Sequence, residues 1–154
     1  MDKHGKDQVL VWRRSYDIPP PECDPASEHC PANDPKYAAN AQASAIRTES
    51  LSTTLERVLP LWESEIVPTI RSGKKVVIAA HGNSLRALVK HLDDISEGGI
   101  TGLNIPTGAP LVYELDEEMR PIPHADAIAP LSGRYLGNQG GIRARIEGVK
   151  NQTK

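Results

Sequence analysis

The most regular pattern of apolar positions along the chain lies in residues 51–70. Apolar side chains recur there every three or four positions, at Leu51, Leu55, Val58, Leu59, Trp62, Ile66 and Ile70. This spacing places them on one face of a helix, so the pattern predicts a helix with one buried side. Thr48 or Ser50 can cap its start, and Gly73 indicates its end. Pro60 lies inside it and predicts a kink, because proline removes an amide donor and crowds the preceding turn.

A second group of patterns predicts a strand, a helix and another strand. Residues 74–80 form a short β-branched run between glycines, which is typical of a strand buried on both faces of a parallel sheet. A helix follows directly, with Asn83 or Ser84 as its cap and apolar positions at Leu85, Leu88, Val89 and Leu92. Residues 110–115 alternate in polarity and predict a further strand. This order predicts an α/β fold with a mixed, mainly parallel sheet flanked by helices.

The remaining segments have weaker patterns. The apolar residues 9–12 are too few for periodicity to distinguish a helix from a strand. Residues 17–49 contain six of the thirteen prolines, and we expect no regular structure there. Residues 134–154 are rich in glycine and net basic, so we expect a loop and a loosely held tail.

Length and charge exclude several classes of protein. A chain of 154 residues predicts one domain, and its net charge of -2 gives no general attraction to nucleic acid or to an anionic membrane. The longest apolar run, 76–80, is far shorter than a membrane span, and the charged residues 1–4 do not resemble a signal peptide. We therefore expect a soluble, cytoplasmic protein without nucleic acid or membrane partners.

The two cysteines lie in the proline-rich segment. A disulfide between Cys23 and Cys30 would close only a short loop, so we expect free thiols. Together with His29 they supply three zinc ligands at an unusual spacing, and we expect no metal.

The candidate chemistry is concentrated in residues 78–86, where the predicted buried strand runs into a helix start. Such a junction places free backbone amides and a partial positive charge beside the strand end, which suits an anion. His81 would add a charged donor to a phosphoryl oxygen, Gly82 a close backbone approach and Asn83 a neutral donor. The alternative is that His81 only terminates the strand.

A rival chemistry would use Ser84 as a nucleophile on a strand-to-helix turn. The second glycine of that motif is absent, because Arg86 stands in its place. Arg13 and Arg14 are a second candidate anion site, since adjacent guanidinium groups can bind one phosphate or carboxylate. The alternative is that the two arginines are part of a solvated surface.

Several segments together resemble one family. The chain is similar, in this order, to the cofactor-dependent phosphoglycerate mutases of the histidine phosphatase superfamily at residues 12–17, 49–51, 58–62, 79–86, 103–108 and 111–115. The resemblance covers about residues 1–122 and resumes at 134–138. It implies the C-terminal two-thirds of a phosphoglycerate mutase domain with a proline-rich loop over 17–49. Residues 123–133 would be an insertion and 134–154 a C-terminal tail.

The resemblance implies a function and a role for each site residue. Its members interconvert 2-phosphoglycerate and 3-phosphoglycerate in glycolysis through a phosphohistidine, primed by 2,3-bisphosphoglycerate and without a metal. His81 resembles the second active-site histidine, which stabilises the transferring phosphoryl group. Gly82 and Asn83 resemble the turn that binds substrate, and Arg13 and Arg14 resemble the pair that holds the substrate phosphate.

The sequence departs from the family at its start. The block that ends in Arg-His-Gly and carries the phosphorylated histidine is absent, and residues 3–5 resemble it only superficially. We therefore expect an incomplete sheet and no catalysis by this chain alone; a homodimer or a complementing N-terminal piece are the partners implied. The alternatives are a noncatalytic phosphate-binding or interaction module and a general histidine-type phosphomonoesterase.

Overall fold

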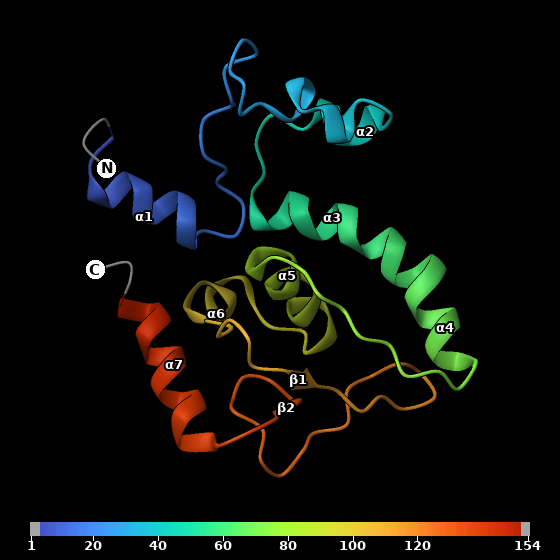
Figure 1. The fold of residues 1–154 in the computed structure, drawn as a ribbon. Coiled ribbons are helices and arrows are strands. Elements are labelled where there is room, and N and C mark those ends of the chain that lie inside the picture. Colours follow the sequence, from blue (N-terminus) through green and yellow to red (C-terminus); the bar gives the residue numbers. More distant parts are fainter. Residues whose placement is uncertain (1–3, 152–154) are drawn as a thin grey trace. The chain divides into compact units, whose positions relative to one another are not determined.

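The computed structural model describes residues 4–151, so the expectations for residues 1–3 and 152–154 lie outside the described part. The chain divides into two compact units, Met1–Thr53 and Thr54–Lys154. Figure 1 shows the helices and strands of the described chain. Within the described residues the fold is mixed α/β and mostly helical, with one two-stranded sheet. The mainly parallel sheet that the sequence predicts is not confirmed.

The first unit begins with a helix and continues through the proline-rich segment. Helix α1 spans Lys6–Arg14, so the apolar run whose pattern was ambiguous is helical. The segment 17–49 is largely irregular, as expected, but it contains two 3-10 turns, η1 (Pro31–Asn33) and η2 (Pro35–Tyr37), and the short helix α2 (Ala41–Ala45). Prolines occupy the first positions of both 3-10 turns, where a missing amide donor costs nothing.

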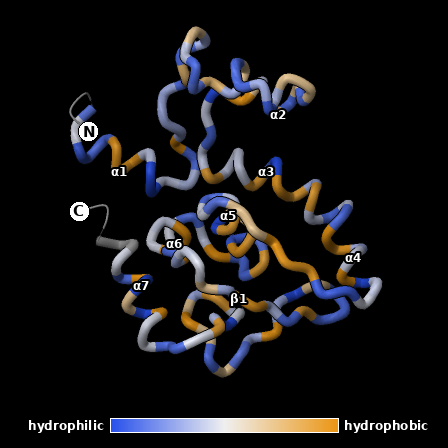
Figure 2. Tube along the Cα trace, viewed as in Figure 1, coloured by the Kyte–Doolittle hydropathy of each residue, from blue (hydrophilic) through white to orange (hydrophobic). Residues whose placement is uncertain are grey.

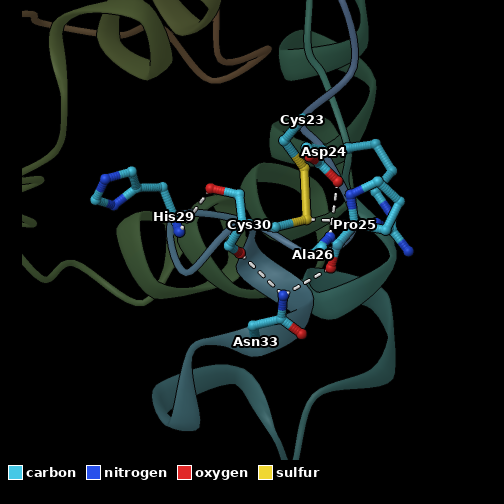
Figure 3. The surroundings of a disulfide bond; sticks show 9 residues. Cys23, Asp24, Pro25, Ala26, His29, Cys30 and Asn33 are labelled. Atoms are coloured by element: carbon cyan, nitrogen blue, oxygen red, sulfur yellow. Dashed lines mark hydrogen bonds between the residues drawn. A yellow bond between two sulfur atoms is a disulfide. The ribbon is translucent and has the colours of Figure 1, made fainter.

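The expectation of free thiols is wrong, because Cys23 and Cys30 form a disulfide (Figure 3). The backbone folds back so that their Cα atoms lie 5.7 Å apart, a separation that a disulfide can span. The side-chain amide of Asn33 donates to the carbonyls of Pro25 and Ser27 and closes the same turn (Figure 3). Local hydrogen bonds that no sequence spacing reveals thus bring the two sulfurs together.

The long helix predicted over 51–71 is confirmed in three consecutive pieces: α3 (Leu51–Leu61), a π-helical turn η3 (Trp62–Ile66) and α4 (Val67–Arg71). Ser50 caps its start, as one of the two predicted candidates. The Ser50 hydroxyl accepts from the Thr53 amide, and the Thr53 hydroxyl accepts from the Ser50 amide. The π-helical turn lies between Pro60 and Pro68, each of which lacks the amide that a regular helix needs.

The buried strand predicted over residues 74–80 is wrong. The segment has no strand assignment, and the side chain of Val77 is 93% exposed. Within residues 4–151, no other backbone group forms a hydrogen bond with the backbone of 74–80. A strand requires a hydrogen-bonded neighbour, and an apolar pattern reports only on side chains.

Helix α5 (Gly82–Leu92) follows this segment and confirms the predicted helix. Its apolar positions Leu88 and Val89 are buried in the second unit. A short helix that the sequence pattern missed, α6 (Glu97–Gly102), comes next, and the Ser96 hydroxyl caps it by accepting from the Gly99 amide.

The sheet pairs β1 (Leu111–Val112) with β2 (Arg134–Tyr135) in an antiparallel ladder. The strand predicted over 110–115 is therefore confirmed for two residues only. Gly133 precedes β2, and a Cβ atom there would lie 2.7 Å from the carbonyl oxygen of Val112. Only glycine permits this close approach of the two strands.

Residues 123–133, predicted as an insertion, form a loop whose ends meet, since the His124 amide donates to the Ser132 carbonyl. The expectation of a loose tail after 134 is wrong for its described part. Helix α7 spans Gln139–Asn151, the side chain of Asn138 caps it by accepting from the Gly141 amide, and Ile142 is 4% exposed. A single buried position gives no apolar periodicity from which a helix could be predicted, yet Ile142 packs this helix against the chain.

The helices of the described chain include none with the length and apolar character that a bilayer span requires.

Candidate functional site

His81 lies at the start of α5 as its N-cap residue. Its backbone is extended, with φ -63° and ψ 151°, and its carbonyl accepts the amide of Leu85. The His81 side chain is exposed and makes no capping hydrogen bond to the helix. The expectation that Asn83 or Ser84 caps this helix is wrong, because both residues lie inside the first turn. Among the described residues no side chain caps the amides of this turn, and the positive end of the 11-residue helix lies beside the imidazole, in a stretch whose residues 81–83 are exposed.

Gly82 leaves open space at the helix start. A Cβ atom built on Gly82 would meet nothing within 4 Å, and its backbone φ is not in the left-handed region. Neither backbone conformation nor packing requires glycine at this position. The missing side chain leaves open space beside the first-turn amides.

Asn83 is exposed and held by a neighbour on the same helix. Its side-chain oxygen Oδ1 accepts a hydrogen bond of 3.3 Å from Nη1 of Arg86. Because this bond engages the acceptor, the other polar atom, Nδ2, is the donor that the side chain can offer to an anion.

Arg86 is the residue whose role sequence reasoning missed. Its side chain is 8% exposed, and Nη2 donates a 2.6 Å hydrogen bond to the carbonyl of Ile100 in α6. The guanidinium thereby joins α5 to α6 and positions Asn83. The spacing of three residues between Asn83 and Arg86 on a helix was the signal available in the sequence.

Arg13 and Arg14 lie in the last turn of α1, in the first unit. Arg13 is exposed and Arg14 is half-buried. His81, Gly82 and Asn83 belong to the second unit, so the structure brings these three together and describes the arginine pair within its own unit.

Two other sets of side chains were possible sites. Ser84 is half-buried in the first turn of α5. The sulfurs of Cys23 and Cys30 are bonded to each other, so they do not act with His29 as thiolate ligands. In the described part of the chain, no three His, Cys, Asp or Glu side chains are grouped closely enough to hold a metal ion.

The side chains with strongly perturbed pKa values lie at the other end of α5, about 16 Å along the helix axis from His81. Asp93 follows the last residue of α5 and accepts from the Tyr113 hydroxyl at 2.5 Å and from the Ser132 amide at 3.0 Å. Burial, with the hydrogen bond to Asp93, raises the pKa of Tyr113. Burial also raises the pKa of Tyr135 to about 12. This cluster joins helix, sheet and loop, and its chemistry is structural.

No protein-family model matches the chain.

Proposed function

We propose that this chain provides the part of a phosphoglycerate mutase-type site that binds a phosphate and stabilises a transferring phosphoryl group. The observation that carries the proposal is the exposed imidazole of His81 at the uncapped, positive start of α5. A protonated imidazole and several backbone amides aimed at one place stabilise the negative charge that develops on phosphoryl oxygens.

Each proposed site residue has a separate role. His81 donates to a phosphoryl oxygen, the amides after Gly82 donate to the other oxygens, and Asn83 adds Nδ2 while Arg86 holds its oxygen. In the first unit by itself, Arg13 and Arg14 are proposed to bind a phosphate or carboxylate through their adjacent guanidinium groups. No metal enters the proposed chemistry, and 2,3-bisphosphoglycerate fits the same donors because it presents the same phosphate group.

The proposed reaction needs a second histidine, which forms the phosphohistidine that exchanges the phosphoryl group between 2-phosphoglycerate and 3-phosphoglycerate. None of the five histidines of this chain follows an arginine and precedes a glycine. We therefore expect this chain to catalyse the reaction only together with a complementing N-terminal piece. The strand of that piece would extend the sheet toward the mainly parallel sheet of the family that the chain resembles. A cytoplasmic, glycolytic setting, with a homodimer as the other partner, belongs to the same proposal.

The first experiment tests phosphate binding. Titration of 3-phosphoglycerate into the ¹⁵N-labelled chain is expected to shift the amide resonances of Gly82, Asn83 and Ser84 at millimolar ligand. His81→Ala should reduce these shifts severalfold, whereas His91→Ala, an exposed histidine on the same helix, should leave them unchanged. Unmoved resonances at the start of α5 would reject the site.

The second experiment tests catalysis. Incubation with ³²P-labelled 2,3-bisphosphoglycerate should leave the chain alone unlabelled. Adding an N-terminal mutase segment that ends in Arg-His-Gly should give labelling of that segment and interconversion of the two phosphoglycerates, both lost in His81→Ala. Labelling that is independent of His81 would contradict the assigned role.

A noncatalytic phosphate-binding module is the second candidate function, and the unpaired backbone of 74–80 favours it, because the sheet of a complete mutase domain is absent from the described residues. Phosphate-induced shifts without any turnover in the mixed sample would select this alternative.

A further inference from the structure

The disulfide between Cys23 and Cys30 is accessible from one end only. Cys30 is 0% exposed, whereas Cys23 is half-buried and stands between the exposed residues Glu22 and Asp24. Figure 3 shows the two sulfurs joined inside the turn that Asn33 closes. Because exchange with a thiol requires access to the sulfur that is attacked, a thiol in solution reaches this bond at Cys23 and not at Cys30.

Arg47, near the end of the proline-rich segment, contacts both cysteines. Its Nη1 donates to Sγ of Cys30 at 3.4 Å, and its carbonyl accepts from the Cys23 amide at 2.9 Å. Among the residues that the structure describes, no carboxylate forms an ion pair with this guanidinium. A cation beside a sulfur stabilises its thiolate, and the sulfur with the more stable thiolate leaves faster in an exchange reaction. Cys30 is therefore the better leaving group of the pair.

The proline-rich segment has little apolar packing that an adduct on Cys23 would disturb. Cys30 is the only buried residue in 17–49. Figure 2 shows hydrophobic colour in this segment as short pieces between hydrophilic ones. A small group attached to Cys23 would consequently displace no core residue of this segment.

The charges beside Cys23 indicate which thiol fits. Glu22 and Asp24 place carboxylates on both sides of Cys23 along the chain, and both residues are exposed. The attacking group is itself a thiolate, so any further negative charge on the incoming molecule adds repulsion at this end of the disulfide. A neutral thiol meets less repulsion than an anionic one.

We infer that the Cys23–Cys30 disulfide is a thiol-exchange site that accepts a small, uncharged thiol at Cys23. The deprotonated thiol attacks Sγ of Cys23, the bond between the two cysteines breaks, and its electron pair leaves on Sγ of Cys30 as a thiolate beside Arg47. The product is a mixed disulfide at Cys23. In the reverse step the Cys30 thiolate attacks the same sulfur and expels the small thiol. The inference goes beyond the proposed function, because it requires no phosphate chemistry.

The first experiment identifies the sulfur that is attacked. The oxidised chain is mixed with 2-mercaptoethanol, quenched with acid at early times, denatured and alkylated with N-ethylmaleimide. Tandem mass spectrometry should then find the mercaptoethanol adduct on Cys23 and the maleimide on Cys30 in roughly nine of ten singly modified molecules.

The second experiment tests the role of Arg47. Arg47→Met keeps an unbranched side chain and removes the charge, so the rate of exchange with 2-mercaptoethanol should fall on the order of tenfold. Arg47→Lys keeps the charge and should lose less of the rate. A purely structural role predicts the opposite result, because a looser turn exposes the disulfide and speeds exchange. Arg145→Met, an exposed change on α7, is the matched control and should keep the wild-type rate.

The third experiment tests the selection by charge. 2-Mercaptoethanesulfonate resembles 2-mercaptoethanol in size and thiol acidity but carries a sulfonate. It should react severalfold more slowly at low salt, and the difference should disappear in about 1 M salt. Glu22→Gln with Asp24→Asn should also remove the difference, and the asparagine keeps the side-chain oxygen that accepts from the Ala26 amide. Glu117→Gln with Glu118→Gln, at two exposed carboxylates of the second unit, is the control and should preserve it.

Three results would overturn the inference. The adduct forms on Cys30 as often as on Cys23; Arg47→Met exchanges as fast as the wild type or faster; or the sulfonate reacts as fast as the neutral thiol at low salt. None of these measurements depends on His81 or on the amides at the start of α5, so failure here is distinct from failure of the proposed function.

Discussion

Arg86 connects the proposed phosphate site to the core of the second unit. Its guanidinium is buried, donates to the Ile100 carbonyl at 2.6 Å and also holds Asn83. Arg86→Ala would leave that buried carbonyl without this donor and open a cavity, so we expect a loss of about 2–4 kcal/mol in the free energy of unfolding, measured by urea denaturation. Arg86→Lys should recover only part of the lost stability. A lysine ammonium cannot reach both the Ile100 carbonyl oxygen and Oδ1 of Asn83, as the planar guanidinium does.

The control for this prediction is Arg143→Ala, an exposed arginine on α7, which should change stability by less than about 0.5 kcal/mol. Equal effects of the two substitutions would show that the Arg86 hydrogen bonds contribute nothing.

The buried Tyr135 and the half-buried Tyr113 predict a loss of stability at alkaline pH. The pKa of Tyr135 is about 12 in the folded chain against about 10 when unfolded, because burial disfavours the phenolate. A folded-state pKa that is raised gives stability that is complete below pH 10 and is lost as pH rises toward 12. The free energy of unfolding should therefore fall with pH in this window, by up to about 1.4 kcal/mol per pH unit for each such tyrosine.

Urea denaturation of the wild type and Tyr135→Phe at pH 8 to 12 checks this. The variant should have the shallower decline, and at pH 7 it should cost little, since among the described residues the buried Tyr135 hydroxyl has no hydrogen-bond partner. Tyr37→Phe, at an exposed tyrosine, should keep the wild-type slope. A parallel decline in all three proteins would contradict the assignment.

For single residues, the sequence could predict the features that depend on residues close by in the chain. The Ser50 cap and the existence of a helix shortly after His81 follow from residues within one turn of each other, although the cap of that helix is His81 and not the predicted Asn83 or Ser84. The bond from Arg86 to Ile100 spans 14 residues, and no local pattern contains it. The disulfide was missed for a related reason, because the turn that closes it depends on the Asn33 side chain.

Among the elements, helix α7 depends on few buried contacts. Ile142 is 4% exposed, and its neighbours along the helix are largely exposed. Ile142→Ala should lower the free energy of unfolding by about 2–4 kcal/mol, or detach the helix from the second unit. Circular dichroism during urea denaturation gives the stability, and hydrogen exchange across residues 139–148 shows whether α7 opens alone.

Arg145→Ala on the same helix is the control and should change neither measurement. If Ile142→Ala behaves like this control, α7 is not held by its buried residue.

Elements were predictable where their hydrogen bonds are local. The helices over 51–71 and 82–92 close their own backbone bonds, so the apolar spacing of residues such as Leu88 and Val89 suffices to find them. Residues 74–80 have the composition of a strand, yet a strand forms only beside a partner. The described chain provides none, and the exposed Val77 is the result.

For the whole molecule, the division into two units predicts independent responses. The disulfide of the first unit joins two cysteines that lie seven positions apart in the sequence. Cross-linking a loop of this size adds about 2–3 kcal/mol to the free energy of unfolding, because it restricts the unfolded chain. Reduction with dithiothreitol, or Cys23→Ser with Cys30→Ser, should therefore speed proteolytic cleavage within residues 17–49.

The second unit should be unaffected by the same treatment. Trp62 reports on it alone in the Trp12→Phe variant, and its urea midpoint should be the same with and without reductant. A midpoint that falls on reduction would show that the two units unfold together.

The exposed run at 74–80 also governs how the purified protein should be handled. Short segments rich in β-branched residues, with little charge and no proline, are those that stack into cross-β fibrils when many copies meet. Five consecutive uncharged residues, 76–80, meet this description, and only Lys74 and Lys75 oppose self-association at one end. Concentrated stocks should consequently turn turbid and bind thioflavin T on storage, and saline buffers, which screen the repulsion between the lysines, should accelerate this aggregation.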